Sequence, residues 1–123
     1  MMKEMKNTLV LGASDNPSRY SYMAVQKLRA YGHPVKAIGR KRTFVDDVSI
    51  DVEQKPHENI DTVTLYLNSR NQKEYYDYIM QLSPKRIIFN PGAENPELAD
   101  LAHAKGIETL EACTLVMLST GQY

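Results

Sequence analysis

The first apolar run of the chain is followed by a glycine and a series of small and polar residues. The run ends at Leu11, and positions 12–21 read Gly-Ala-Ser-Asp-Asn-Pro-Ser-Arg-Tyr-Ser. Between a strand and a helix, such a segment lets backbone N–H groups and the positive helix end approach a phosphate. Only the first glycine of the G-x-G-x-x-G motif is present, and a Walker A loop is not matched. The segment predicts a phosphate-binding turn, with an ordinary turn of the same composition as the alternative.

A basic segment, Gly39-Arg40-Lys41-Arg42, follows the second apolar run. An acidic residue at this place would bind the ribose of NAD and repel a phosphorylated ribose. Guanidinium and ammonium groups attract phosphate instead, so the segment favours a phosphorylated adenosine ligand, with a solvated basic turn as the alternative. Two more polar loops, at 68–70 and 90–94, follow the third and fourth apolar runs.

Side chains that could act as a nucleophile or a base are few and scattered. His33, His57 and His103 fall in a turn, a polar loop and a helical segment, and we interpret them as surface residues. Glu94 is a loop carboxylate, and Cys113 comes just before a helical segment, where a helix N-terminus lowers a thiol pKa. A free cysteine is as often a small buried apolar residue. We therefore predict no catalytic residue and no metal-ligand set.

The elements that must position these loops are short apolar runs alternating with helical patterns. Strands are predicted at 8–11, 35–38, 62–67, 86–89 and 108–110. The predicted helices begin near Ser21, Asn71, Asn95 and Thr114, with Ser21 and Asn71 as capping residues. Residues 39–60 are expected to form a long connection with small extended pieces around 44–45 and 48–52. The alternation predicts an α/β fold of three layers with a doubly wound, parallel, five-stranded sheet in the order 3-2-1-4-5.

Length and charge limit the classes of function. A chain of 123 residues predicts one domain over 1–123. Fifteen basic and fifteen acidic residues give zero net charge, which argues against nucleic acid or an anionic membrane as a partner. Of the eight tyrosines, Tyr75, Tyr76 and Tyr78 fall at helical spacing and are assigned to helix packing, with Tyr75 and Tyr78 in its buried stripe, rather than to base stacking. No run approaches the roughly 18 apolar residues of a membrane span, and the first residues lack the apolar core of a signal peptide, so a cytoplasmic protein is expected.

The segments Gly12-Ala13-Ser14-Asp15-Asn16-Pro17, Arg19-Tyr20-Ser21 and Asn90-Pro91-Gly92 resemble those of the stand-alone CoA-binding proteins. The domain of that family is similar to the N-terminal domain of the succinyl-CoA synthetase alpha subunit. The resemblance extends from Thr8 to about Leu118, and the string G-A-S-x-N-P-x-R-Y-S is its most specific part. It implies a Rossmann-like domain that binds coenzyme A or acyl-CoA along the strand ends.

The resemblance also implies which residues contact the ligand. Gly12, Ser14 and Asn16 would lie against the pyrophosphate, with Arg19 and Ser21 near it, and Arg40 or Lys41 would meet the 3′-phosphate. Leu67 and Asn68 would border the adenosine or pantetheine, and Asn90, Pro91 and Gly92 would line the pantetheine. Ala13 and Gly39 complete the expected binding residues of the first two turns. Cys113 is added because the ligand thiol could form a mixed disulfide with it. On this interpretation, replacing Gly12 by Val would block the close approach of the pyrophosphate without unfolding the sheet.

Three functions stay open at this point. The first is a small protein that binds CoA without catalysis. The second is a reductase-like enzyme that uses NADP or another nucleotide, and the third is a regulatory subunit that senses CoA and acts on a partner enzyme. The missing second and third glycines favour CoA over NADP, and the lack of a paired nucleophile and base favours binding over catalysis. The sequence also leaves open a homo-oligomer.

Overall fold

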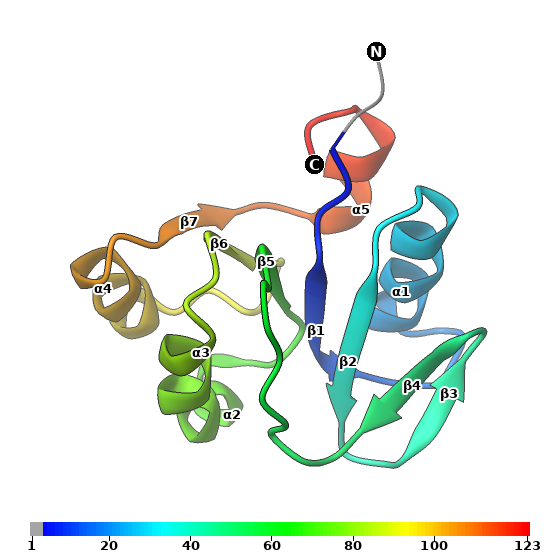
Figure 1. Cartoon of the computed structure of the whole chain (residues 1–123), viewed down its shortest axis with the longest axis horizontal. Coiled ribbons are helices and arrows are strands. Elements are labelled where there is room, and N and C mark those ends of the chain that lie inside the picture. Colours follow the sequence, from blue (N-terminus) through cyan, green and yellow to red (C-terminus); the bar gives the residue numbers. More distant parts are fainter. Residues whose placement is uncertain (1–3) are drawn as a thin grey trace.

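Residues 4–123 are described by a computed structural model, in which seven strands form one sheet with helices on both faces (Figure 1). The strands are β1 (Thr8–Ala13), β2 (Val35–Gly39), β3 (Thr43–Val45), β4 (Val48–Asp51), β5 (Thr62–Leu65), β6 (Arg86–Phe89) and β7 (Glu108–Glu111). Their spatial order is β3-β4-β2-β1-β5-β6-β7. Neighbouring strands are parallel except for the β3–β4 hairpin, which is antiparallel. The predicted α/β class with a doubly wound, mostly parallel sheet is therefore confirmed.

The number and order of the strands differ from the prediction. The extended pieces expected around 44–45 and 48–52 form the hairpin, and β4 pairs with β2 on the side away from β1. Since the hairpin occupies the place beside β2, the strand at 62–65 lies on the other side of β1 instead of next to β2. The expected order of five strands was wrong for this reason.

The helices are α1 (Tyr20–Ala30), α2 (Ser69–Gln72), a single 3₁₀ turn η1 (Lys73–Tyr75), α3 (Tyr76–Leu82), α4 (Pro96–Ala104) and α5 (Thr114–Ser119). The predicted start of a helix at Asn95 is confirmed, and the side chain of Asn95 caps α4 by accepting a hydrogen bond from the N–H of Leu98. The two predicted caps, Ser21 and Asn71, were wrong. Ser21 lies inside the first turn of α1, and Asn68 caps α2 by accepting from the N–H of Asn71.

Two apolar clusters hold the layers together, one on each face of the sheet. Leu9 and Leu11 of β1 point into the cluster that packs against α3 and α4. Val10, between them, points to the opposite face, where Val25 of α1 and Leu118 of α5 complete the second cluster. The alternation along β1 therefore fixes both helix layers at once. Within residues 4–123, no helix is long and apolar enough to cross a membrane.

Candidate functional site

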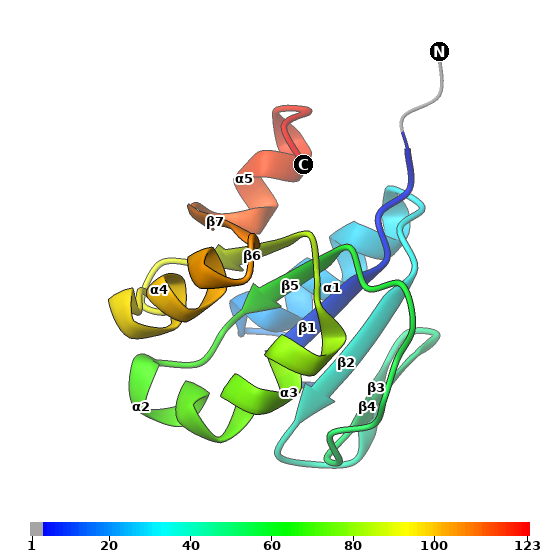
Figure 2. The ribbon, with the colours of Figure 1, turned by 60° about the vertical axis from the view of Figure 1, so that its left-hand side comes forward.

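A cleft of about 720 Å³ lies beyond the carboxyl ends of β1, β2 and β5. The three strands are parallel, so these ends lie at the same edge of the sheet, where the chain passes from β5 to α2 (Figure 2). The turns that follow β1, β2, β5 and β6 all contribute to the walls. Twelve of the fifteen predicted binding residues line the cleft, namely Gly12, Ala13, Ser14, Arg19, Ser21, Gly39, Arg40, Lys41, Leu67, Asn68, Pro91 and Gly92.

The remaining three predicted residues are Asn16, Asn90 and Cys113, and they do not line the cleft. Asn16 is exposed, and its Oδ1 accepts hydrogen bonds from the N–H and the hydroxyl of Ser18 at 3.0 and 2.8 Å. Asn90 is buried, and its side chain bonds to neighbouring elements of the core. Cys113 is a half-buried residue at the N-cap of α5.

Two glycines bring the backbones of adjacent loops into close contact at the base of the cleft. Gly12 has φ +90°, and a Cβ there would lie 2.9 Å from the carbonyl oxygen of Tyr66. A Cβ at Gly39 would lie 2.2 Å from the carbonyl oxygen of Ala13. The expectation that Gly12→Val leaves the sheet intact was therefore wrong, because the valine would be strained in φ and would push on the backbone after β5. Both glycines are required by the fold itself.

The three basic residues after β2 have different partners. Arg42 donates two hydrogen bonds to the Glu53 carboxylate, one of them at 3.0 Å, and this pairing lowers the pKa of Glu53 to about 2. The Nζ of Lys41 lies 3.1 Å from the carboxylate of Asp15. Arg40 forms no hydrogen bond or ion pair with any residue of the segment 4–123. Arg40 is therefore the member of the triplet that is available to an anionic ligand.

A buried glutamine fixes two walls of the cleft relative to each other. The Nε2 of Gln72 donates to the carbonyl oxygens of Leu67 and Ala93 at 2.8 and 2.7 Å. Its Oε1 accepts from the Nδ2 of Asn95 at 2.9 Å. A buried polar group without a hydrogen-bond partner costs free energy, so these bonds are favoured and set the distance between the loops after β5 and β6.

Sequence reasoning missed eight residues that line the cleft: Asp15, Tyr20, Thr43, Tyr66, Asn71, Glu74, Tyr75 and Ala93. Tyr75 was assigned to the buried stripe of a helix, but it lies in the 3₁₀ turn and is half-buried at the cleft. Burial raises the pKa of its phenol, Glu74 raises it further, and the charge of Arg40 lowers it. For Asn71, Glu74 and Tyr75 the sequence did carry a signal, because they belong to the polar start of the helix that follows the third predicted strand.

The histidines and Glu94 each have a defined environment. His33 was expected at the surface but is buried, and its Nδ1 accepts from the N–H of Lys6 at 2.9 Å. His57 is half-buried in the loop before β5, and His103 shares a 2.8 Å hydrogen bond with the hydroxyl of Thr109. Glu94 accepts from the N–H of Gly92 at 3.0 Å. Within residues 4–123, no three His, Cys, Asp or Glu side chains are grouped so as to hold a metal ion.

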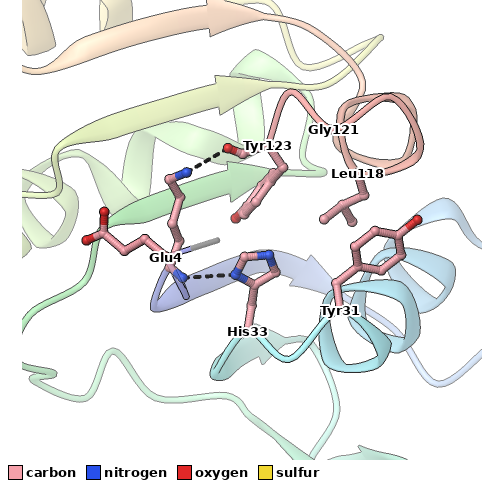
Figure 3. Close-up of a pocket in the computed structure, with 7 residues that line it drawn as sticks. Glu4, Tyr31, His33, Leu118, Gly121 and Tyr123 are labelled. Atoms are coloured by element: carbon pink, nitrogen blue, oxygen red, sulfur yellow. Dashed lines mark hydrogen bonds between the residues drawn. The ribbon is translucent and has the colours of Figure 1, made fainter. Parts of the chain in front are cut away.

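A second, smaller cavity of about 260 Å³ lies between the first described residues, the turn after α1 and the end of the chain (Figure 3). Glu4, Tyr31, His33, Leu118 and Tyr123 contribute to its walls. It adjoins the amino end of β1, because the N–H of Thr8 donates to the carbonyl of Pro34 in the same turn as His33. The two cavities therefore lie at opposite ends of the sheet.

A doubly wound sheet with a cleft across its strand ends and a glycine turn after its first strand defines a Rossmann-like domain. The family model described as a CoA binding domain matches residues 6–119, so the chain belongs to the CoA-binding domain family. The resemblance seen in the sequence is confirmed by this match.

Solved structures share this fold. A crystal structure described only as that of an uncharacterized protein is 47% identical, with a TM-score of 0.95 over 98% of this chain and 100% of that chain. Cell-free ID.343 from Thermus thermophilus is 19% identical, with a TM-score of 0.85 over 97% of this chain and 91% of that chain. The dinucleotide-forming acetyl-coenzyme A synthetase 1 from Ca. Korarchaeum cryptofilum is 18% identical, with a TM-score of 0.69 over 88% of this chain and 26% of that chain. No curated protein matches the sequence.

Proposed function

We propose that this protein binds coenzyme A or an acyl-CoA in the cleft at the strand ends, as a cytoplasmic protein whose activity is binding rather than catalysis. The observation that carries the proposal is the guanidinium of Arg40, which has no hydrogen-bond or ion-pair partner among residues 4–123 and lies beside a glycine turn in a chain of the CoA-binding family. A free cation at the end of β2 suits the 3′-phosphate that distinguishes CoA from dephospho-CoA.

The rest of the ligand follows the turns that line the cleft. The pyrophosphate approaches the turn of Gly12 and Ser14 at the start of α1, where backbone N–H groups and the helix dipole favour an anion. Arg19 adds a guanidinium that has no hydrogen-bond partner among residues 4–123. The pantetheine then runs along Leu67 and Gly92 on the far side of the cleft.

Calorimetric titration with CoA, dephospho-CoA and NADP tests the proposal. Wild-type protein should bind CoA most tightly. Arg40→Ala should weaken CoA binding by roughly 10- to 100-fold, because a hydrogen bond between charged groups is lost, and should change dephospho-CoA binding far less. Arg42→Gln is the matched control, since Arg42 belongs to the same basic triplet but is paired with Glu53 and does not line the cleft.

Two outcomes would contradict the assignment. If the wild-type protein binds NADP but not CoA, the reductase-like function is favoured instead. If Arg40→Ala weakens CoA and dephospho-CoA equally, Arg40 does not contact the 3′-phosphate.

The predicted proximity of Cys113 to the ligand thiol has its own test. Cys113 is half-buried and lies outside the cleft lining, next to α5. A disulfide between the two thiols would also need an oxidant that accepts two electrons and two protons, so proximity is measured without one. CoA should slow alkylation of Cys113 under reducing conditions, and equal labelling with and without CoA would place the ligand thiol elsewhere.

A further inference from the structure

One acidic side chain lies inside the turn that the pyrophosphate of the proposed ligand would approach. The Oδ2 of Asp15 accepts a hydrogen bond from the hydroxyl of Thr43 at 2.9 Å, and it lies 3.1 Å from the Nζ of Lys41. All three residues line the cleft. These contacts join the turn after β1 to the segment that leads from β2 into β3, and both contacts lower the pKa of Asp15.

The two contacts of Asp15 have separate effects. The ion pair neutralises Lys41, which would otherwise present a second cation next to Arg40 at the end of β2. The hydrogen bond holds Thr43, the first residue of β3, beside the phosphate-binding turn. The first effect depends on the charge of Asp15, and the second needs only an oxygen acceptor.

We propose that Asp15 is a specificity-determining residue of the cleft: its carboxylate withholds Lys41 from ligand phosphates, so that recognition of the phosphate monoester depends on Arg40. The inference rests on the proposed function, because it concerns how the same site distinguishes CoA from dephospho-CoA. A lysine ammonium is a mobile point charge on a flexible stem, so it turns to another anion when its partner is lost.

The size of the effect follows from the exposure of the pair. The side chains of Lys41 and Asp15 are 71% and 35% exposed. Exposed ion pairs contribute little free energy, so releasing Lys41 should change affinity by roughly two- to fivefold. An effect of this size is measurable as a ratio of affinities for two ligands that differ only in the 3′-phosphate.

Three variants separate the charge of Asp15, which pairs with Lys41, from its hydrogen bond to Thr43. Asp15→Asn keeps an oxygen acceptor for Thr43 but removes the charge, so it should raise the ratio of CoA to dephospho-CoA affinity by roughly two- to fivefold. The increase should disappear in the double variant with Lys41→Ala, because the released ammonium is then absent. Asp15→Ala removes both contacts, and Arg42→Gln is again the control within the triplet.

Hydrogen exchange without ligand gives a second measurement. Asp15→Ala and Thr43→Val should speed exchange of the backbone amides in β3 (Thr43–Val45), whereas Asp15→Asn should not. If the wild-type protein does not bind CoA, the proposed function is wrong, but the exchange measurement still tests the hydrogen bond between Asp15 and Thr43 because it needs no ligand. An unchanged affinity ratio in Asp15→Asn, or an increase that persists with Lys41→Ala, would overturn the role of Asp15. Equal exchange rates in all variants would show that the hydrogen bond between Asp15 and Thr43 does not hold β3 in place.

Discussion

At the scale of single residues, the three cations that follow β2 differ in their contacts. Arg40, Lys41 and Arg42 are consecutive and carry the same charge. Lys41 pairs with Asp15 and Arg42 with Glu53, whereas Arg40 has no ion-pair partner within the described segment 4–123. A basic triplet predicts attraction for phosphate, but two of its three charges are already engaged. The cation that remains is the one on which ligand recognition should depend.

The pairing of Arg42 with Glu53 predicts a pH-dependent contribution to stability. The pKa of Glu53 is lowered from 4.5 to about 2, mainly by hydrogen bonds from Arg42. Because the folded-state pKa is depressed, the contribution is present above about 4.5 and is lost as the pH falls towards 2. NMR titration of the Glu53 side chain should give a midpoint near 2. In Arg42→Gln the midpoint should move up towards 4.5, and a wild-type midpoint already near 4.5 would show that the pair does not form in solution.

Which residues line the cleft was largely predictable, and their partners were not. Carboxyl ends of parallel strands meet at one edge of a sheet, so residues after each apolar run could be gathered from the sequence alone. The partner of Lys41 lies in the preceding loop, 26 positions earlier, and no local pattern indicates it. The resemblance placed Asn90 along the pantetheine, and an amide after a strand suits a ligand contact as well as a backbone contact. Only the packing shows that its side chain is already bonded within the core.

At the scale of elements, short and mixed segments were the limit of prediction. The β3–β4 hairpin has strands of three and four residues with exposed positions at Phe44 and Ser49. Such strands lack a continuous apolar run, so they were read as parts of a connection rather than as sheet members. Their place beside β2 then determined the position of β5, and an error about two short strands became an error about the order of the whole sheet.

Asn90 connects three elements, and this predicts a loss of stability when it is replaced. Its Nδ2 donates to the hydroxyl of Thr64 at 2.7 Å and to the carbonyl of Leu65 at 2.9 Å, and its Oδ1 accepts from the N–H of Thr114 at 2.9 Å. Asn90→Ala removes all three bonds. The N–H of Thr114 then loses its buried acceptor, whereas the hydroxyl of Thr64 keeps its 2.8 Å bond to the hydroxyl of Thr114. The free energy of unfolding should fall by about 2–4 kcal/mol in urea denaturation.

Asn16→Ala provides the control for this prediction. Asn16 is exposed, and its side chain bonds only to Ser18 among residues 4–123. Its replacement should cost less than about 1 kcal/mol. Equal losses for the two asparagines would show that the bonds of Asn90 do not hold β5 and α5 together.

At the scale of the whole molecule, one end of the sheet is open to solvent and the other is covered by side chains. The carboxyl ends of the strands open into the cleft, whereas the amino ends are covered by Tyr123. Beneath this tyrosine lies Arg86, which is 8% exposed and pairs with no carboxylate among residues 4–123. Its Nε donates to the hydroxyl of Thr62 at 2.7 Å, and its guanidinium carbon lies 4.4 Å from the centre of the Tyr123 ring. The aromatic ring thus takes the place of a counter-charge over a buried cation.

This arrangement predicts that Tyr123 stabilises the fold without affecting ligand affinity. Tyr123 also shares a hydrogen bond with the hydroxyl of Thr8, its backbone oxygen accepts from the Nζ of Lys6 at 2.7 Å, and its ring meets His33 edge-on (Figure 3). Tyr123→Ala should lower the free energy of unfolding by about 2–4 kcal/mol, because the ring over Arg86 is lost. Tyr123→Phe keeps the ring and should cost only about 0.5–1.5 kcal/mol.

Tyr31→Ala is the control, since Tyr31 lines the same cavity but is 47% exposed, and it should change the free energy of unfolding by less than about 0.5 kcal/mol. CoA affinity well below the melting temperature should be the same in all three variants, and a parallel loss of affinity in Tyr123→Ala would mean that the two ends of the sheet are coupled.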